Sequence, residues 1–228
     1  MAAPKPLSLQ TAKPPPLTEL VYRQVRDAIM NGVFAPGQML RQEEVAAALG
    51  VSRNPLREVL PRLESEGQVV LYPRRGYAVI SLDPADIEEV FDLRVLLDTQ
   101  LAKAAIARRT EKDVKAARDI LRAMAGLIDA HGVDDRATWF RLNAEFHDAL
   151  HAPAGRKYYM RALEMARGLL ESYIRMEVNL TGDMQQAHRE HEALVDAFAA
   201  GDARRFVALT KAHGEHTKQR LLQGLSKQ

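Results

Sequence analysis

Helical periodicity opens the patterned part of the chain, after about sixteen residues. Apolar positions recur every three to four residues from about Thr18 to Met30, and again over residues 42–49 and after Ser52. Asn31-Gly32 ends the first stretch, and Gly50 separates the second from the third. The pattern therefore predicts three helices, with Thr18 and Ser52 as the N-caps of the first and third helices.

Two short strands are predicted after Gly67. Residues 69–71 and 77–80 are rich in β-branched and aromatic side chains, and the basic segment Pro73-Arg74-Arg75-Gly76 lies between them. Helices followed by a strand pair with a basic tip predict a winged helix-turn-helix over residues 17–80. Residues 1–16, rich in Pro, Ala and Lys, predict a disordered tail.

The remainder of the chain, residues 84–222, is helical throughout by the same criterion. Asp83-Pro84 begins it as an N-cap followed by proline at the first helical position. Residues that begin or end helices divide this part of the chain into about six helices with short connections, which is typical of an antiparallel bundle. They fall at Thr110, His131-Gly132, Ala152-Pro153, Thr181-Gly182 and Gly201-Asp202. The predicted fold class is mainly α: a winged helix-turn-helix followed by an all-α antiparallel helical bundle.

Charge and histidine are distributed unevenly between these two parts. Up to Leu82 the chain has 10 Lys and Arg against 7 Asp and Glu, whereas all seven histidines lie at His131 or beyond. Cysteine is absent, which excludes disulfides and thiolate ligands. No apolar run approaches the roughly 20 residues that span a bilayer, and the N-terminus lacks a signal-peptide core. We therefore expect a cytoplasmic protein without a membrane partner.

The third helix carries the chemistry of a DNA-reading element. Arg53 and Arg57 are four residues apart and share one face, opposite an apolar stripe that begins at Leu56. The arginine fork matches the O6 and N7 acceptors of guanine, and the Ser52 hydroxyl at a helix N-terminus suits a phosphate. Arg74 and Arg75 at the strand tip suit the minor groove or a phosphate. On spacing alone, a solvated face of a small helical domain remains the alternative.

Residues 20–77 resemble the DNA-binding domain of the GntR family of bacterial transcription regulators. The matching stretches are Phe34-Ala35-Pro36-Gly37, Leu49-Gly50-Val51-Ser52-Arg53, Pro55-Leu56-Arg57-Glu58, Leu63-Glu64-Ser65-Glu66-Gly67 and Arg75-Gly76. The resemblance implies that Arg53 and Arg57 contact bases and that Gly76 enters the minor groove. The full predicted DNA-binding set is Arg41, Ser52, Arg53, Asn54, Arg57, Arg74, Arg75 and Gly76.

Pro61 departs from the usual pattern of this family, because many relatives have a polar residue there. Its ring clashes with the carbonyl oxygen of Arg57 in an ideal helix, and it donates no hydrogen bond, at a cost of roughly 3 kcal/mol. We expect the third helix to kink at this position, after its reading segment.

Histidines on three predicted helices form a candidate metal site. Asn143 and His147 are four residues apart on one helix face, and His191 and His213 lie on two later helices. Three imidazoles and a side-chain oxygen suit zinc, nickel or manganese. From spacing alone, a histidine is more often a surface or hydrogen-bonded core residue than a ligand, so both interpretations stay open.

Residues 84–222 resemble the FCD effector domain of the FadR branch of the GntR family. The matching pieces are Leu93-Arg94, Leu97-Asp98, Phe146-His147, Leu150, Glu190-His191-Glu192-Ala193-Leu194, Ala197, Gly201-Asp202 and His213. The resemblance implies a divalent metal held by Asn143, His147, His191 and His213, and a small carboxylate effector held partly by Arg94. Asn143 replaces the usual acid in part of the family with a neutral oxygen, so weaker metal binding is expected.

The other histidines have less specific assignments. His188 and His216 each lie three residues from a proposed ligand, and either replaces it or hydrogen-bonds behind it. His131, His151 and Asp98 are expected to be structural.

The predicted function is a DNA-binding transcription regulator, most simply a repressor. A homodimer reads a pseudo-palindromic DNA operator, a small organic acid in the helical domain controls operator affinity, and residues 78–83 couple the two domains. In the alternative, the metal ion itself is the signal. A metal-dependent hydrolase is disfavoured because the H-E-x-x-H pattern is absent and no carboxylate is assigned as general base, so we predict no enzyme.

Overall fold

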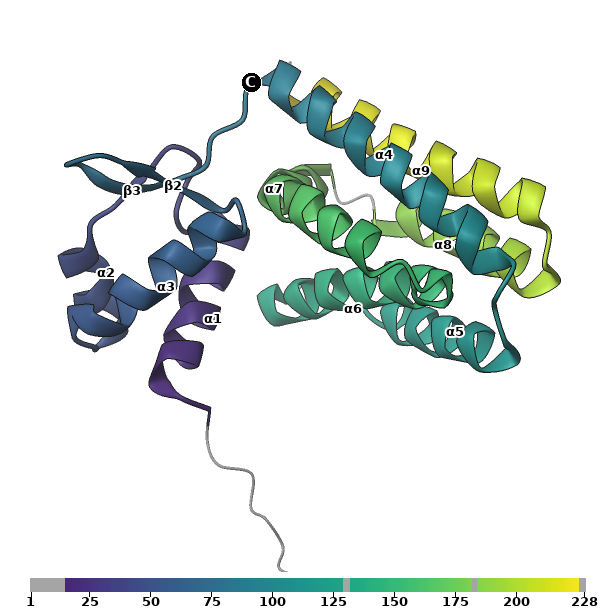
Figure 1. Cartoon of the computed structure of the whole chain (residues 1–228), viewed down its shortest axis with the longest axis horizontal. Coiled ribbons are helices and arrows are strands. Elements are labelled where there is room, and N and C mark those ends of the chain that lie inside the picture. Colours follow the sequence, from purple (N-terminus) through teal and green to yellow (C-terminus); the bar gives the residue numbers. More distant parts are fainter. Residues whose placement is uncertain (1–14, 129–131, 182–183, 226–228) are drawn as a thin grey trace, which may run out of the picture.

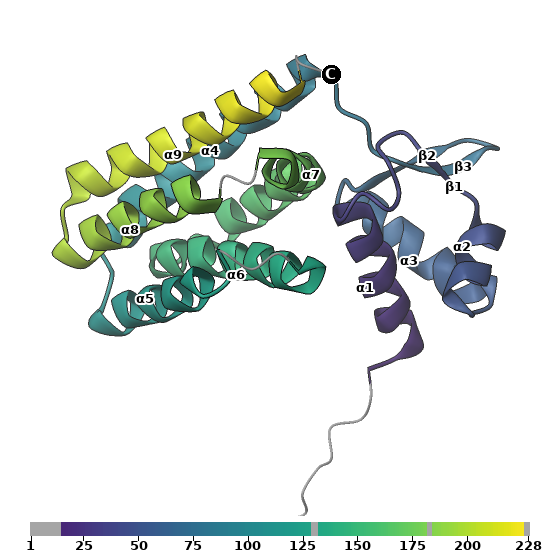
Figure 2. The same cartoon turned by 180° about the vertical axis from the view of Figure 1, so that it is seen from behind.

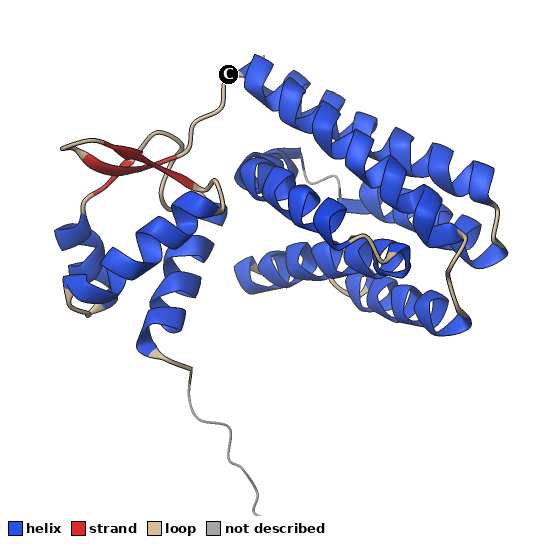
Figure 3. Cartoon of the chain, viewed as in Figure 1, coloured by secondary structure: helices blue, strands red, loops and turns tan. Residues whose placement is uncertain are grey.

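The computed structural model describes residues 15–128, 132–181 and 184–225 and contains two domains joined by a linker (Figure 1). A small domain with three strands comes first, and a larger domain built from helices follows. Figure 3 shows strands in the first domain only, for the described part of the chain. This arrangement confirms the predicted fold class. Residues 1–14 of the predicted tail, together with His131 and Gly182, lie outside the described residues.

The N-terminal domain is a winged helix-turn-helix. Its elements are α1 (Leu17–Met30), β1 (Met39–Leu40), α2 (Gln42–Leu49), α3 (Arg53–Ser65), β2 (Val69–Tyr72) and β3 (Gly76–Val79). The antiparallel sheet has the order β1-β3-β2, so that Ala78 of β3 lies opposite both Met39 and Val70. Apolar residues from α1, α2, α3 and the sheet form one buried core, which fixes α3 against the sheet and leaves its other face exposed.

Of the two predicted N-caps in this domain, Thr18 is wrong and Ser52 is confirmed in position. The first helix begins at Leu17 with Pro16 in the N-cap position, so Thr18 already lies within the helix. Ser52 does occupy the N-cap position of α3, with an extended backbone at φ −73° and ψ 167°, but its side chain makes no capping hydrogen bond there. Ser52 therefore has the backbone conformation of an N-cap without the side-chain hydrogen bond that stabilises a helix start.

Pro61 lies inside a helix that continues for one more turn, to Ser65. Its ring is exposed, whereas Leu60 and Leu63 on the other face are fully buried. Burial of these side chains is worth roughly 1.5–3 kcal/mol each, which offsets the missing hydrogen bond. Proline therefore does not end α3.

The described residues of the C-terminal domain form six long helices. They are α4 (Pro84–Ile106), α5 (Glu111–Ala125), α6 (Val133–His151), α7 (Lys157–Thr181), α8 (Met184–Ala200) and α9 (Ala203–Leu225), with a short 3-10 helix η1 (Ala152–Ala154) before α7. Asp83 and Thr110 each form a capping box with the third helical residue, which fixes the starts of α4 and α5. In both views α4 and α9 lie side by side along one edge, and α5 and α6 lie along the opposite edge (Figures 1 and 2).

Helix α7 contacts both domains. Arg175 of α7 donates to the side chain of Asn31, at the end of α1, at 2.9 Å. The backbone N–H of Leu82 in the linker donates to the Tyr173 hydroxyl at 2.7 Å. The approach is close: a Cβ on Gly67 would lie only 2.9 Å from Leu169 of α7, and the φ of +73° at Gly67 also favours glycine. No helix in the described part of the chain is both long and apolar enough to cross a membrane.

Candidate functional site

The predicted reading face of α3 lies on its exposed side. Arg53 and Arg57 are exposed, while Leu56, Val59 and Leu63 are buried in the domain core, as the periodicity predicted. Arg53 forms an ion pair with Glu43 of α2 at 2.7 Å, with both side chains mostly exposed. Such surface pairs contribute about 0–1 kcal/mol, so a base or phosphate competes for this guanidinium at little cost.

The remaining predicted DNA-binding residues border the same side. Arg41 precedes α2 and pairs with Glu44 at 3.2 Å, again on the surface, and Asn54 is exposed in the first turn of α3. Ser52 is exposed and its hydroxyl does not cap α3, so the hydroxyl is available to a phosphate.

The wing turn holds its arginines in a defined backbone conformation. The N–H of Arg75 bonds to the carbonyl oxygen of Tyr72 at 3.0 Å, with Pro73 and Arg74 between them. Proline at the second position and a positive φ at the third, +65° for Arg74, define a type II turn. Arg74 is the sole described non-glycine residue with positive φ, whereas Gly76 takes φ +100° without strain. This strained conformation at an exposed tip is consistent with the predicted DNA-binding role of Arg74, which stays a prediction.

Three of the four predicted metal ligands come together in the C-terminal domain. His147 of α6, His191 of α8 and His213 of α9 each offer a ring nitrogen within 4.8 Å of the others. All three are buried, and their ring centroids are 4.9–5.1 Å apart. The helix packing therefore builds a compact group of imidazoles from residues up to 66 positions apart.

Three ring nitrogens of this histidine site lack protein partners in the described structure. Within the described residues, Nε2 of His147 and both ring nitrogens of His191 are buried without a hydrogen bond. Burial, reinforced by the neighbouring histidines, holds the pKa of His147 and of His191 well below 6.5, so both rings are neutral. Neutral imidazole is the form that binds metal, and buried unpaired nitrogens are rare in proteins, so the donor set fits a divalent ion.

Asn143 lies one helical turn before His147 on α6 and is half-buried. Its role as a fourth ligand stays a prediction. His188 and His216 lie outside the three-histidine group in the described structure: His188 is 3.8 Å from Glu192, and Nδ1 of His216 is 3.1 Å from Glu190.

Glu190 is a residue of this site that the sequence did not single out. Its Oε2 lies 2.6 Å from Nδ1 of His213. Burial raises the pKa of Glu190, but hydrogen bonds from His213, Gln186 and His216 outweigh this effect and lower the pKa to about 2. An ionised carboxylate therefore stands directly behind one of the predicted ligands.

A buried charged cluster adjoins the histidine site. Arg94 and Asp98 of α4 are both buried, and Nε of Arg94 donates to Asp98 at 3.4 Å. Arg167 of α7 donates to the other Asp98 oxygen at 3.2 Å and to Asp148 at 2.7 Å. Burial lowers the pKa of His151, which lies 3.6 Å from Asp98, to about 4, so this histidine adds no charge. The cluster therefore has two guanidinium groups around a single fully buried carboxylate.

Arg167 was also missed by the sequence analysis, although a signal existed. It lies four residues after Leu163 and three before Leu170, both fully buried, so it occupies the apolar stripe of α7. A charged residue at such a position indicates a buried partner. Asp98 and His151, which were expected to be structural, belong to this cluster.

A DNA-reading winged helix-turn-helix joined to a helical domain with a buried histidine site defines a class, the DNA-binding transcriptional regulators. The family description "Bacterial regulatory proteins, gntR family" matches residues 17–79, and the FCD domain matches residues 89–216. The chain therefore belongs to the GntR family and carries an FCD effector domain. This membership confirms the prediction of a regulator that is not an enzyme.

Individual relatives agree with this assignment. The HTH-type transcriptional regulator YdhC of Bacillus subtilis (strain 168) is 29% identical over 186 residues, 81% of each chain. The HTH-type transcriptional repressor GlaR of Escherichia coli (strain K12) is 28% identical over 199 residues, 84% of this chain and 90% of GlaR. The structure of E. coli McbR/YncC, at 17% identity, has a TM-score of 0.78 over 93% of this chain and 100% of that chain, which shows the shared fold.

Proposed function

We propose that the protein is a repressor of the FadR branch whose operator affinity is controlled by a small carboxylate bound beside a divalent metal ion. The observation that carries this proposal is the buried group of unpaired imidazole nitrogens next to two arginines that share the buried carboxylate of Asp98. The name of GlaR, a transcriptional repressor, supports the direction of control. We expect it to act in the cytoplasm, where operator DNA lies.

Zinc, nickel or manganese fits the proposed metal position. His147, His191 and His213 would hold the ion, with the neutral oxygen of Asn143 as the proposed fourth ligand. Three protein imidazoles leave a coordination position open to an exchangeable oxygen donor such as a carboxylate. When bound, the ion supplies a positive charge that attracts this anion.

The arginines define where the rest of the acid lies. In the described structure Arg94 makes a single hydrogen bond, from Nε to Asp98, and burial lowers its pKa. Arg167 is shared between Asp98 and Asp148, and Asp148 is about half exposed. Asp98 is thus shared by both arginines, and a carboxylate from the effector would give Arg94 a second anionic partner.

Further unpaired groups surround the same region of the domain. The Oγ1 of Thr99, the Nε of Arg167 and the indole Nε1 of Trp139 are buried without a hydrogen bond in the described structure. Trp139 stacks against His191, with 6.5 Å between ring centroids. Native structures leave few such groups unpaired, so a polar ligand is the simplest source of their partners.

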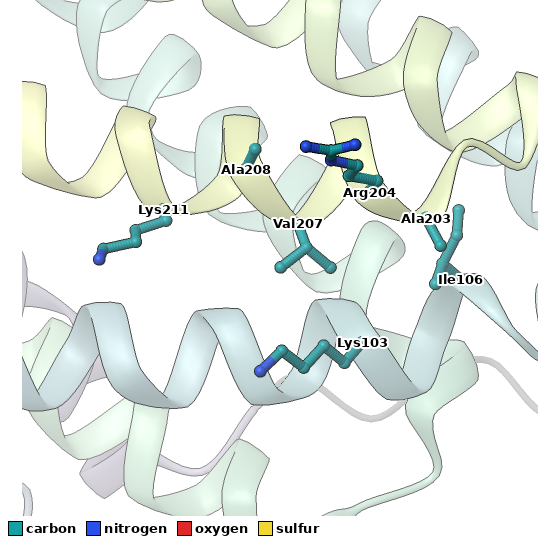
Figure 4. Close-up of a pocket in the computed structure, with 7 residues that line it drawn as sticks. All are labelled: Lys103, Ile106, Ala203, Arg204, Val207, Ala208 and Lys211. Atoms are coloured by element: carbon teal, nitrogen blue, oxygen red, sulfur yellow. The ribbon is translucent and has the colours of Figure 1, made fainter.

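The proposed homodimer uses the outer face of α4 and α9. Leu93 and Leu96 of α4 are exposed, and Leu96 lies midway between Glu89 and Lys103, seven residues from each. In a two-fold antiparallel contact centred on Leu96, Glu89 of one protomer lies opposite Lys103 of its partner. Figure 4 shows the apolar groove between α4 and α9, with Lys103 of α4 and Lys211 of α9 along it.

The charge pattern makes this dimer testable. Lys103→Glu places like charges opposite each other and should dissociate the dimer, whereas Glu89→Lys combined with Lys103→Glu should restore it. Sedimentation analysis of the three proteins measures this. A dimer that survives Lys103→Glu, or a double variant that stays monomeric, contradicts the proposed face.

Coupling between effector and DNA is proposed to run along α7 as well as through the linker. Arg167 contacts the charged cluster, and two turns later Arg175 contacts Asn31 of the DNA-binding domain. Arg175 is partly buried, pairs with Glu171 at 2.8 Å and packs on the Phe140 ring. A shift of α7 that follows an anion at Arg167 would therefore reach α1 directly.

The DNA-binding part is tested by selecting an operator from random duplexes and measuring affinity for its variants. Arg53→Ala and Arg57→Ala should each lose about 1–3 kcal/mol at one base pair and relax the preference there. Arg118→Ala, on the surface of the other domain, serves as the control. Unchanged preferences in both arginine variants would remove them from the reading face.

Binding to the same operator also distinguishes the proposed function from the alternative in which the metal ion itself is the signal. If the ion is the signal, zinc alone added to metal-free protein should produce the whole change in operator affinity. In the proposed function zinc alone has a small effect, because the acid that would contact Arg94 and Arg167 is absent.

A further inference from the structure

Glu190 and His213 form a pair across two helices that the proposed function does not itself require. Glu190 is on α8 and His213 on α9, and their side chains are 13% and 10% exposed. The Glu190 carboxylate is held on both oxygens. Gln186 donates to Oε1 at 3.1 Å, His216 Nδ1 lies 3.1 Å from the same oxygen, and Arg220 is 3.8 Å away. Oε2 is directed to His213 at 2.6 Å.

This contact determines which nitrogen of His213 carries the proton. An ionised carboxylate only accepts hydrogen bonds, so Nδ1 of His213 must be the protonated nitrogen. The lone pair is then on Nε2, the nitrogen on the other side of the ring. Free imidazole interconverts between the two tautomers, and Glu190 removes that freedom.

His147 and His191 have no equivalent restraint on three of their ring nitrogens. Among the described residues, Nε2 of His147 and both nitrogens of His191 are buried without a hydrogen-bond partner. His213 is therefore a member of the site whose orientation and tautomer are set before any ion arrives. A fixed ligand reduces the ordering that metal binding requires, and a carboxylate behind the ring makes the imidazole a stronger donor.

We propose that Glu190 is a positioning residue that holds His213 as the Nδ1–H tautomer and so presents Nε2 to a divalent cation. The inference rests on the proposed metal site. Carboxylates placed behind a metal-binding histidine typically change metal affinity 10- to 100-fold, and we expect a loss in about that range without Glu190.

A merely structural role is the competing explanation, because Glu190 also ties α8 to α9. Two variants separate the roles. Glu190→Ala removes the carboxylate from His213, and Glu192→Ala removes an exposed carboxylate from the same helix, two residues away, as a matched control. Glu190→Asp tests whether a shorter carboxylate rescues the effect.

The experiment uses full-length, 15N-labelled protein freed of metal. Long-range 1H–15N spectra above neutral pH report the protonated nitrogen of each histidine, and competition with a chelator reports zinc affinity. We expect His213 to be protonated at Nδ1 in the wild type and in Glu192→Ala, and to sample both tautomers in Glu190→Ala. Zinc affinity should fall about 10- to 100-fold in Glu190→Ala only, with at least partial recovery in Glu190→Asp.

The outcomes decide the two proposals separately. Wild-type His213 protonated at Nε2, or Glu190→Ala with zinc affinity within two-fold of wild type, overturns the role of Glu190. A wild type that binds no zinc overturns the metal site, while the tautomer spectra of the metal-free protein still decide whether Glu190 positions His213. A loss of zinc affinity that comes with unfolding of metal-free Glu190→Ala, seen in its spectra, supports the structural explanation and overturns the positioning role.

Discussion

Replacing Asp98 by asparagine tests the electrostatics of the buried cluster. Asp98 accepts from Arg167 at 3.2 Å and from Arg94 at 3.4 Å, and it is 6% exposed. Burial raises its pKa, but Arg167, His151 and Arg94 outweigh burial and keep the carboxyl ionised. Asp98→Asn preserves the shape and leaves the two guanidinium groups without their shared negative charge.

The expected cost follows from burial. Removing one partner from a buried ion pair costs about 3–5 kcal/mol, against about 0–1 kcal/mol for an exposed pair. At roughly 2–4 °C per kcal/mol for a chain of this size, the midpoint of thermal unfolding should fall by about 6–20 °C. Asp196→Asn is the matched control, because Asp196 is 67% exposed and 4.0 Å from Arg118.

Urea unfolding of metal-free protein measures these differences. A small carboxylate such as acetate should stabilise Asp98→Asn more than the wild type, because the anion replaces the missing charge. A cost below about 1 kcal/mol for Asp98→Asn, equal to that of Asp196→Asn, would show that the two arginines do not depend on Asp98. The proposal that Arg94 and Arg167 form an anion-binding effector site would then be wrong.

Three further predictions concern other parts of the molecule. His151 has a folded-state pKa of about 4 against 6.5 unfolded, so the native state binds fewer protons; its contribution is complete above about pH 6.5 and is lost as pH falls toward 4. Urea titrations should show this acid destabilisation, about 3 kcal/mol, reduced in His151→Gln. Arg74→Gly should raise stability by about 1 kcal/mol by relieving the positive φ while weakening DNA binding; a loss of stability would contradict the strain. Arg175→Ala should leave operator affinity of ligand-free protein nearly unchanged but diminish its change on ligand binding, and an unaltered response would exclude α7 as a route.

The helices of both domains were predictable because their signals are local. Apolar spacing and the capping residues Asp83 and Thr110 lie within one or two turns of the ends they define. Strand β1 was missed because Met39–Leu40 is two residues long and is defined by its pairing with β3. The kink expected at Pro61 stays a prediction, while buried contacts of α3 on the opposite face accompany a helix that continues to Ser65.

The site was predictable only in part, for the same reason. The family resemblance brought His147, His191 and His213 together correctly, and the structure places their nitrogens within reach of one ion. The pairing of Glu190 with His213 joins residues 23 positions apart on two helices, which no single-helix pattern reveals. Arg167 carried a weak signal on the apolar stripe of α7, but its partner Asp98 is 69 positions away.

The central claim is that ligands at the histidine site and its neighbouring arginines control operator affinity. The most direct measurement compares operator affinity before and after a chelator and dialysis remove metal and small molecules, with native mass spectra recording what leaves. We predict a change of about five-fold or more in the wild type and none in a variant that combines His147→Ala with Arg94→Met. Equal affinities before and after loss of a bound ion and acid, or wild-type protein that neither carries an ion nor takes up zinc, would contradict the account.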